Sequence, residues 1–490
     1  MNKDKKEKTI TLVGGGVMSL TLAALINEIL PNLQINILER LSACGLESSD
    51  ALNNAGTGHA GYCELNYTPA DKTGNINIDR ALEINQNFEA SLIFWAYLNK
   101  KYPFFNTKKF IKKTPHISFV SGGKNISFLK KRFAILKKQP LFKEMIFTEN
   151  PKIIEKWSSL LIHGRSEQEN IAATKIDHGT DVNFGELTKQ LLRVLKKNKN
   201  FKLYLDSETE DIKQTEDHKF KITFKNLKAG NKNILSSDHI FLGTGGRAIA
   251  MLQKMRLVEA KGYAGFPISG RWLVCDKVNL TKQHNAKVYT QVMDGAPPMS
   301  VPHLDLRVIN NKKILLFGPF AGFNLKLLKF GTFWDFPGSI KANNILPMLL
   351  VLFKNLSLLV YLIKQSFMNH HLRINELKNF FPLARPADWK LLNAGQRVQI
   401  IKNCPFEGSK LEFGTEVIYT KNKKLAALIG ASPGASVSVA SMANVFENFF
   451  SKKDYQRLKK IIPSIGIDLN KHPTTLKKIR TKTYQSLGLW

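Results

Sequence analysis

The chain has 490 residues, and its hydrophobic content of 43% and charged content of 23% are ordinary for a globular protein with a large core. Its 72 Lys and Arg residues outnumber its 39 Asp and Glu residues and give a net charge of +33. No DNA- or RNA-binding motif accompanies this charge, so lysine enrichment of solvated faces, or attraction to an anionic lipid surface, is favoured over a nucleic-acid partner.

The N-terminal forty residues predict a strand, a glycine turn, a helix and a second strand. Residues 9–13 are apolar and rich in β-branched side chains, which indicates a buried strand, and residues 17–30 repeat apolar side chains at helical spacing. Three glycines, 14–16, separate them. A second strand is predicted at 34–38 and is followed by Glu39. This order is typical of the βαβ unit that begins a dinucleotide-binding domain.

The small residues of this unit have distinct predicted roles. Gly14 permits the tight turn, and Gly16 lets the backbone approach a pyrophosphate at the N-terminus of the helix. Glu39 can accept a hydrogen bond from a ribose hydroxyl. Ser19 stands where a third glycine is usual, and it is small enough for the helix to pack closely on the strand. The sequence therefore predicts a dinucleotide site here.

After Glu39 the chain enters a long loop, 47–69, and then alternates between helical and extended patterns. Helices are predicted at 79–100, from near Asp181, from Arg247, within 340–381 and from Ala435. Strands are predicted at 201–205, 219–225, 239–243, within 262–325, and at 396–401, 414–419 and 425–429; 115–120 and 126–129 are strands or short elements.

The strands at 396–401, 414–419 and 425–429 are expected to return to the first domain, which makes the cofactor domain discontinuous. It is predicted to comprise 1–75, 175–260 and 390–490. An α+β substrate domain made of 76–174 and 261–389 is inserted into it.

The longest apolar stretch is 345–363, and Pro347, Lys354 and Asn355 interrupt it. These interruptions predict two short helices rather than one membrane span, and both helices are expected to be buried. No apolar signal core precedes the first strand. The four cysteines form no CxxC pair, so neither disulfides nor a metal cluster is expected.

A series of longer blocks identifies a family. They are NNAGTGH (53–59), ELNYTP (64–69), GTDVNFGE (179–186), GYAGFP (262–267), GAPPMSVPHLD (295–305), LLFGPFAGF (315–323), GQRVQIIK (395–402), FGTEV (413–417) and IGASPGAS (429–436). Through these blocks, over nearly its whole length, the chain resembles the malate:quinone oxidoreductase family.

The resemblance implies an α/β fold, with an FAD-binding, Rossmann-like domain of the glutathione-reductase type. It implies oxidation of (S)-malate to oxaloacetate, a step of the tricarboxylic acid cycle, with the electrons passed to a membrane quinone. The expected location is cytoplasmic, peripheral on the inner face of the cell membrane. Two alternatives stay open: an FAD-dependent L-2-hydroxyglutarate dehydrogenase or oxidase, and a flavin-binding membrane-surface protein without turnover.

A 2-hydroxy acid must lose its hydroxyl proton as hydride leaves the adjacent carbon, and imidazole, with a pKa of about 6.5, is the usual base. His303 is the first candidate. Asp305 lies two residues further along a predicted strand and so faces the same side; it or Arg307 could orient the base or bind substrate. His59, beside glycines, could be base, flavin contact or substrate ligand. Arg397 offers a forked cation for a carboxylate.

Residues 430–434 match the G-x-S-x-G pattern of a hydrolase nucleophile. Pro433, the residue after the serine, has no N–H for an oxyanion hole, so a glycine turn that faces a flavin is the better interpretation. The candidate cofactor-binding residues are Gly14, Gly15, Gly16, Ser19, Glu39, Arg40, Gly58, Gly243, Gly245, Ser432 and Gly434.

Overall fold

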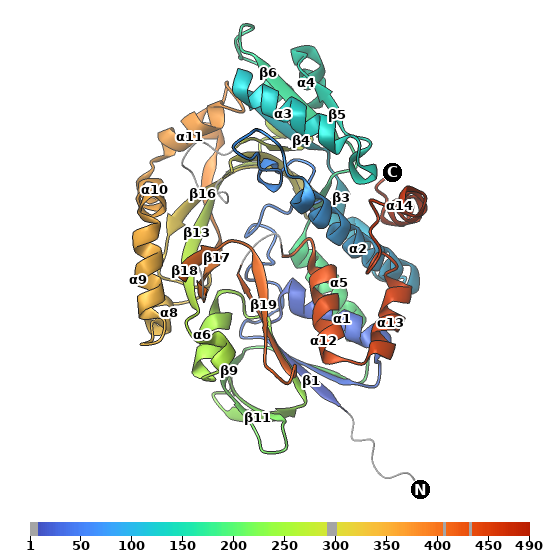
Figure 1. The fold of residues 1–490 in the computed structure, drawn as a ribbon, viewed down its shortest axis with the longest axis vertical. Coiled ribbons are helices and arrows are strands. Elements are labelled where there is room, and N and C mark those ends of the chain that lie inside the picture. Colours follow the sequence, from blue (N-terminus) through green and yellow to red (C-terminus); the bar gives the residue numbers. More distant parts are fainter. Residues whose placement is uncertain (1–7, 292–300, 405–407, 431–433) are drawn as a thin grey trace.

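The computed structural model describes residues 8–291, 301–404, 408–430 and 434–490, and two large sheets organise them (Figure 1). The first sheet has six strands, in the order β19 (Thr415–Tyr419), β20 (Leu425–Gly430), β12 (His239–Leu242), β1 (Thr9–Val13), β2 (Gln34–Leu38) and β8 (Phe201–Tyr204). Its strands pair in parallel, except that β19 runs antiparallel to β20. The predicted strand–turn–helix–strand start is confirmed at its centre.

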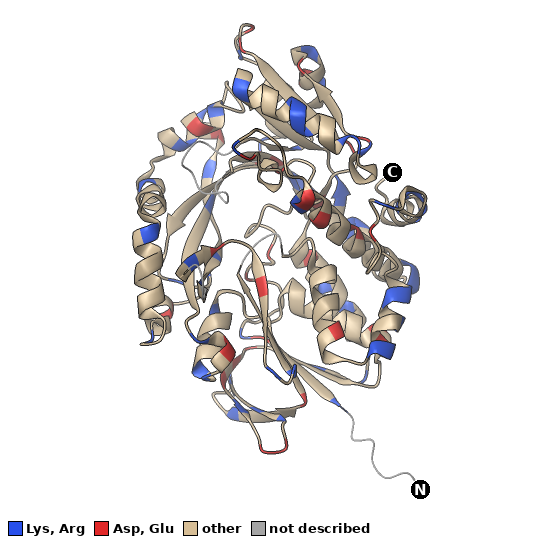
Figure 2. Cartoon of the chain, in the orientation of Figure 1, with Lys and Arg blue, Asp and Glu red and all other residues tan. Residues whose placement is uncertain are grey.

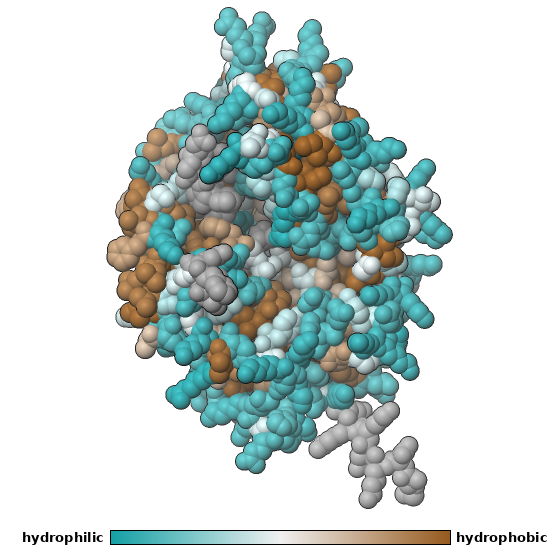
Figure 3. Space-filling view, in the orientation of Figure 1, coloured by the Kyte–Doolittle hydropathy of each residue, from teal (hydrophilic) through white to brown (hydrophobic). Residues whose placement is uncertain are grey.

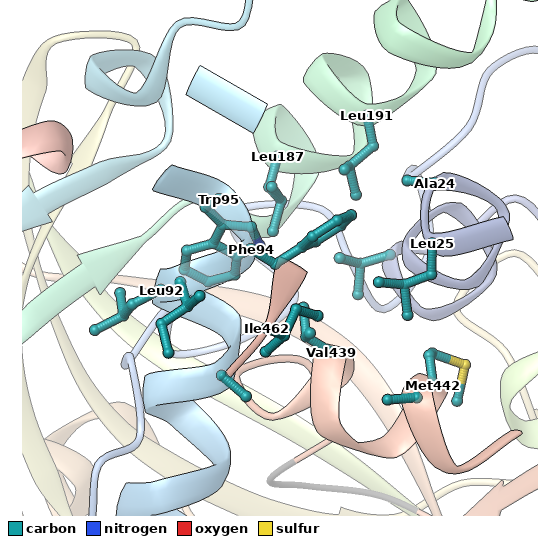
Figure 4. Close-up of a cluster of buried hydrophobic side chains, with 14 of the residues drawn as sticks. Ala24, Leu25, Leu92, Phe94, Trp95, Leu187, Leu191, Val439, Met442 and Ile462 are labelled. Carbon is teal, nitrogen blue, oxygen red and sulfur yellow. The ribbon is translucent and has the colours of Figure 1, made fainter. Parts of the chain in front are cut away.

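Helices cover one face of this sheet and build the largest core. They are α1 (Val17–Ile29), α2 (Asp79–Lys101), α5 (Phe184–Leu195), α12 (Ser438–Phe449), α13 (Lys452–Ile461) and α14 (Pro473–Leu487). Figure 4 shows Phe94 and Trp95 of α2 among Leu187 of α5 and Val439 of α12. Helix α2, which the sequence assigned to the substrate domain, therefore packs in the core of the cofactor side.

A small antiparallel sheet and one helix cover the opposite face. They are β11 (Lys232–Ser237), β10 (Phe220–Asn226), β9 (Ser207–Gln214) and α6 (Ala248–Lys254). Ile222 and Phe224 of β10 pack with Val13 of β1 and Leu242 of β12, while Leu12 belongs to the core on the other face. Because neighbouring side chains of a strand point to opposite faces, β1 is buried on both sides, which explains its continuous apolar run.

The second sheet has nine strands drawn from distant parts of the chain. Their order is β18 (Gly408–Glu412), β17 (Lys390–Cys404), β13 (Ala264–Cys275), β16 (Lys312–Phe323), β15 (His303–Ile309), β14 (Lys287–Tyr289), β4 (His116–Ser121), β6 (Ile171–Ile176) and β5 (Ile146–Thr148). A two-stranded sheet pairs β3 (Ile111–Lys113) with β7 (Thr180–Val182). The remaining α-helices are α3 (Gly123–Leu136), α4 (Pro151–Trp157), α7 (Val278–Thr281), α8 (Asp335–Ser339), α9 (Ile345–Lys354), α10 (Leu356–Phe367) and α11 (His370–Lys378).

Two predictions about this region are wrong. Residues 126–129 are part of helix α3, not a strand. Residues 396–401 belong to β17, which pairs with β13 and β18 in the second sheet instead of returning to the first. Alternation of apolar and polar side chains identifies a strand but not its partner, and the partner β13 lies more than a hundred residues earlier in the chain.

The apolar stretch 345–363 forms two helices as predicted, α9 and α10, and they meet at an angle of 81°. The expectation that both are buried is wrong, because Leu346, Phe353 and Phe367 are 61%, 68% and 85% exposed. Their buried residues are Pro347, Val351, Leu358 and Leu362. Within the described residues no single helix is long and apolar enough to cross a membrane; only this bent pair, counted together, meets that requirement.

Candidate functional site

A cavity of about 320 Å³ lies at the carboxyl ends of β1, β2 and β12 and extends to β17 of the second sheet. Its walls include residues 13–18, 38–41, 47–49, 53–57, 207–209, 243–247, 396–398 and 434–436 together with His59. Open parallel sheets bind their ligands at this edge. Residues 47–49, 53–57 and His59 of the long loop 47–69 therefore form part of the wall of this cavity.

The glycine turn after β1 leaves room that side chains would fill. Gly14 has φ +94°, and a Cβ on it would lie 2.5 Å from the Gly243 carbonyl oxygen. Gly16 is the N-cap residue of α1, and no side chain of its own caps the helix. A Cβ on Gly16 would meet only Ser49 Oγ, at 3.5 Å, so the space beside it is open to the cavity. The Val17 N–H of this helix N-terminus donates to Ser49 Oγ at 2.9 Å, and the open space beside Gly16 fits a diphosphate group.

The Glu39 side chain is held by the turn that it faces. Its Oε2 accepts a hydrogen bond from the Gly15 N–H at 2.7 Å, and its Oε1 accepts one from the Leu41 N–H at 2.8 Å. Burial raises the pKa of this carboxyl, and the two backbone hydrogen bonds act in the opposite direction. A carboxylate has further lone pairs, so Glu39 can still accept from a ribose hydroxyl in the cavity.

Most of the predicted cofactor residues line the cavity: Gly14, Gly15, Gly16, Glu39, Arg40, Gly243, Gly245 and Gly434. Ser19 and Gly58 are not among the lining residues. A Cβ on Gly243 would lie 2.2 Å from Ser19 Oγ, and a Cβ on Gly58 would lie 2.0 Å from Thr180 Oγ1, so both positions serve close packing. Ser432 lies outside the described residues.

His59 is the candidate base that the structure places in the cavity wall. Its Nδ1 is buried and has no hydrogen-bond partner among the described residues. Burial, followed by the charges of His116 and His303, lowers the pKa of His59 to about 3, so the imidazole is neutral. The rings of Tyr67 and Tyr289 stand edge-on to it, with centroids 6.2 and 6.1 Å away.

His303 and Asp305 form a pair next to Tyr289. Neither residue is among the described residues that line the cavity. His303 Nδ1 lies 2.9 Å from Asp305 Oδ2, and the His303 ring stacks on Tyr289 at 4.3 Å. Burial alone would raise the pKa of Asp305, but His303, Lys287 and Arg307 bring it down to about 2.

The guanidinium of Arg307, which the sequence predicts as an orienting or substrate-binding group, is engaged inside the protein. Its Nε lies 2.7 Å from Asp181 Oδ1, and its Nη1 donates to the carbonyl oxygens of Ala51 and Asn54 at 2.7 and 2.6 Å. A Cβ on Gly56 would lie 2.2 Å from Arg307 Cζ. Arg307 therefore anchors the loop that forms one wall of the cavity.

Lys287, which the sequence did not single out, completes this buried cluster. It is fully buried, and its Nζ lies 3.0 Å from Asp181 Oδ1 and 3.6 Å from Asp305 Oδ2. It also donates to the carbonyl oxygen of Ala55 at 2.9 Å. With Arg307 it supplies two positive charges beside the carboxylates of Asp181 and Asp305.

Asp181 was taken from the sequence as the acidic start of a helix. In the structure it lies on β7, and α5 begins only after Asn183, whose side chain accepts a hydrogen bond from the Glu186 N–H. The sequence also gives no sign that Lys287 belongs to this buried cluster, because a lysine in a short strand usually points to solvent. A spacing in the sequence does not show that two residues on separate strands share one buried ion-pair cluster.

Arg397 lies on β17 opposite Ile268 of β13, and its side chain lines the cavity. Burial lowers the pKa of its guanidinium, whereas Tyr289, Tyr67 and Glu64 act to raise it; the group stays cationic. It makes no hydrogen bond or ion pair with another residue in the part of the chain that the structure describes. A forked cation without a protein partner, beside a cavity, suits a carboxylate ligand.

Comparisons with known proteins agree on one family. The family model described as malate:quinone oxidoreductase matches residues 6–489. A probable malate:quinone oxidoreductase of Hahella chejuensis (strain KCTC 2396) is 46% identical over 489 residues, which cover 99% of this chain and 98% of that protein. One of Bacillus cereus (strain AH187) is 44% identical over 493 residues, which cover 100% of this chain and 98% of that protein.

Solved structures confirm the fold class. L-alpha-glycerophosphate oxidase from Mycoplasma pneumoniae, with FAD bound, has a TM-score of 0.55 at 14% identity and covers 91% of this chain and 96% of its own. Glycine oxidase from Bacillus cereus has a TM-score of 0.55 at 13% identity and covers 94% of this chain and 97% of its own. At these identities the likeness concerns the fold alone.

Proposed function

The chain belongs to the malate:quinone oxidoreductase family, and from this premise we propose that it oxidises (S)-malate to oxaloacetate and delivers the electrons to a quinone. Family membership favours malate over L-2-hydroxyglutarate and an enzyme over a non-catalytic flavin-binding protein. The structural observation that supports the substrate class most directly is Arg397, a cation in the cavity wall without a partner among the described residues. Malate is a dianion, and such a group meets one of its carboxylates.

FAD is the cofactor, and the cavity fits it. The turn 14–16 and the N-terminus of α1 would hold its diphosphate, and Glu39 would hold a ribose hydroxyl. When bound, FAD supplies the acceptor for the hydride that leaves the substrate carbon. The side chains of the protein bind the substrate and orient it around that carbon.

We assign the removal of the hydroxyl proton to His59, because a base must lie within reach of the proton it takes, and His59 lines the cavity. A substrate carboxylate paired with Arg397 brings negative charge toward this imidazole. That charge favours the protonated ring and raises the proton affinity of His59 relative to the protein without substrate. His303 and Asp305 act as positioning residues, since the His303 ring stacks on Tyr289, whose ring stands edge-on to His59.

The proposal includes attachment of the protein to the inner face of the cell membrane. A quinone acceptor resides in the bilayer, so the enzyme must approach it. The net charge of +33 attracts an anionic lipid surface. This attraction is electrostatic and weakens as salt shortens the Debye length.

Gly16→Val is expected to give a folded protein without FAD. A Cβ at this position meets only Ser49 Oγ at 3.5 Å, so the protein tolerates it, but the added side chain occupies the space of the diphosphate. The purified variant should lack the flavin absorbance band and should not reduce a soluble quinone analogue with malate. Thermal unfolding should remain one cooperative transition.

The matched control for this variant is Gly123→Val. Gly123 begins α3 on the surface, and a Cβ there meets nothing within 4 Å. This protein should purify yellow and active. A yellow and active Gly16→Val protein would contradict the placement of the FAD diphosphate at this turn.

A further inference from the structure

An apolar surface on α9 and α10 lies outside the site described so far. Its members are exposed by 41% to 85%, and we call them the α9–α10 face: Ile345, Leu346, Leu349, Leu350, Phe353, Leu356, Val360, Ile363 and Phe367. Figure 3 shows this face as a brown region at the left of the molecule, over the helices labelled α9 and α10 in Figure 1. Contiguous apolar surface of this kind marks an interaction site, unlike single exposed apolar side chains.

Aromatic residues extend the surface beyond the two helices. Phe333 and Trp334 are 62% and 79% exposed and stand directly before α8, which leads into α9. Trp and other aromatic side chains are enriched where a membrane meets water, because one part of the ring is apolar and another part tolerates headgroups. Their position at the edge of the α9–α10 face fits that interface.

All charged side chains between Asp335 and Glu376, the segment that contains α9 and α10, are positive. Between Asp335 and Glu376 the sequence contains Lys341, Lys354 and Lys364 and one further cation, Arg373, but no Asp or Glu. The three lysines are exposed, and Figure 2 shows blue but no red on α9 and α10. Lysine stems lie along apolar surface while the ammonium groups reach toward anionic headgroups.

The geometry fits a surface that lies in a membrane interface rather than one that crosses it. The helices have 10 and 12 residues and meet at 81°, whereas a span needs about 20 apolar residues in one helix. Val351 and Leu362 pack against Phe266 and Ile268 of β13, which fastens the pair to the second sheet. Strand β17 of the same sheet carries Arg397 at the cavity, so the apolar face and the substrate wall share one sheet.

We propose that the α9–α10 face docks the protein on an anionic bilayer, with its apolar side chains among the acyl chains and its lysines at the headgroups. This inference rests on the proposed quinone acceptor, which is dissolved in that bilayer. A second copy of the chain fits the face less well. In a two-fold interface both copies would bring the same positive charges and no Asp or Glu from residues 336–375, and like charges at an interface are unfavourable.

The experiment compares the holoenzyme with Leu346→Gln/Leu349→Gln/Phe353→Gln in flotation with phosphatidylcholine–phosphatidylglycerol vesicles. Salt of about 1 M shortens the Debye length to about 3 Å and removes the electrostatic part of binding. Under these conditions the wild type should stay partly bound, because apolar insertion is not screened. The triple variant should lose vesicle binding by on the order of tenfold or more, since fewer apolar groups enter the bilayer.

The matched control is Ile234→Gln/Val258→Gln/Val278→Gln, three apolar residues that are 59%, 76% and 63% exposed elsewhere on the surface. It should bind vesicles as the wild type does. Complete release of the wild type by salt, or wild-type binding by the α9–α10 variant, would overturn the proposal. The proposal would also be overturned if the wild type were a dimer, the α9–α10 variant were a monomer, and both bound vesicles equally.

Malate-driven reduction of a soluble quinone analogue is measured for the same proteins. It should be equal in all three, because none of the changed residues lines the cavity. Equal activity with lost binding supports the docking surface. Failure of the wild type to use malate would instead defeat the proposed function, whatever the vesicles show.

Discussion

His59→Gln is expected to lower the turnover number with malate by about 10²–10⁴-fold, the usual loss when a positioned base is removed. His59 is the candidate base in the cavity wall, and its Nδ1 has no partner among the described residues. Glutamine is similar in size and polar, so the cavity should keep its shape, but it cannot take a proton. Flavin content should be unchanged, which separates loss of the base from loss of the cofactor. Stopped-flow measurement of flavin reduction by malate gives the rate directly.

His303→Gln is the matched control for this prediction. We expect a smaller loss of turnover together with a lower midpoint of thermal unfolding, because the change removes the partner that lies 2.9 Å from buried Asp305. The outcome that would reverse the two roles is a large loss of turnover in His303→Gln with near-normal turnover in His59→Gln.

Arg397→Lys is expected to lower kcat/KM for malate by about 10- to 100-fold, which corresponds to about 1–3 kcal/mol of transition-state binding. Lysine keeps the positive charge but loses the two parallel N–H groups that match a carboxylate. Arg397 has no protein partner among the described residues, so the change breaks no internal contact and its effect falls on the ligand. Steady-state kinetics with malate and a soluble quinone analogue measure the loss.

Arg271→Lys provides the comparison for Arg397→Lys. Arg271 lies on β13, the strand next to β17, but it is not among the cavity-lining residues. The kcat/KM of the Arg271→Lys variant for malate should stay close to that of the wild type. Equal kinetics for Arg397→Lys and the wild type would exclude Arg397 as the carboxylate-binding group.

The parts of the fold that could be predicted are those determined by local patterns. The strand at 9–13, the turn at 14–16 and the following helix are contiguous, and their apolar periodicity and glycines report burial and backbone geometry directly. Placement of Gly14 in the cavity wall follows from that turn alone. The blocks of family resemblance added the substrate, which no local pattern contains.

The rest depended on contacts between distant segments. The pattern around Arg397 predicts a strand, but its place in the second sheet comes from pairing with β13. Arg307 looks available in the sequence, yet Asp181 and two carbonyl groups of the loop 51–57 occupy its guanidinium. An ion pair between separate strands leaves no periodic signal.

The sequence also could not predict how far the side chains of the apolar stretch 345–363 are exposed to solvent. An apolar run such as 345–363 predicts helices, but the same composition serves a buried core and a surface that meets lipid. Only the side of each helix that contacts the second sheet is covered in the structure, and Leu346 and Phe353 remain exposed. The outcome depends on what lies beside the helices, which their own residues do not encode.

Anaerobic addition of malate to the purified yellow protein, followed by flavin absorbance, tests the central claim most directly. We predict that malate bleaches the oxidised flavin faster than L-2-hydroxyglutarate does at equal concentration, and that a soluble quinone analogue then restores the colour whereas NAD does not. A flavin that stays oxidised with malate, or that L-2-hydroxyglutarate reduces faster, would contradict the assignment of malate as substrate.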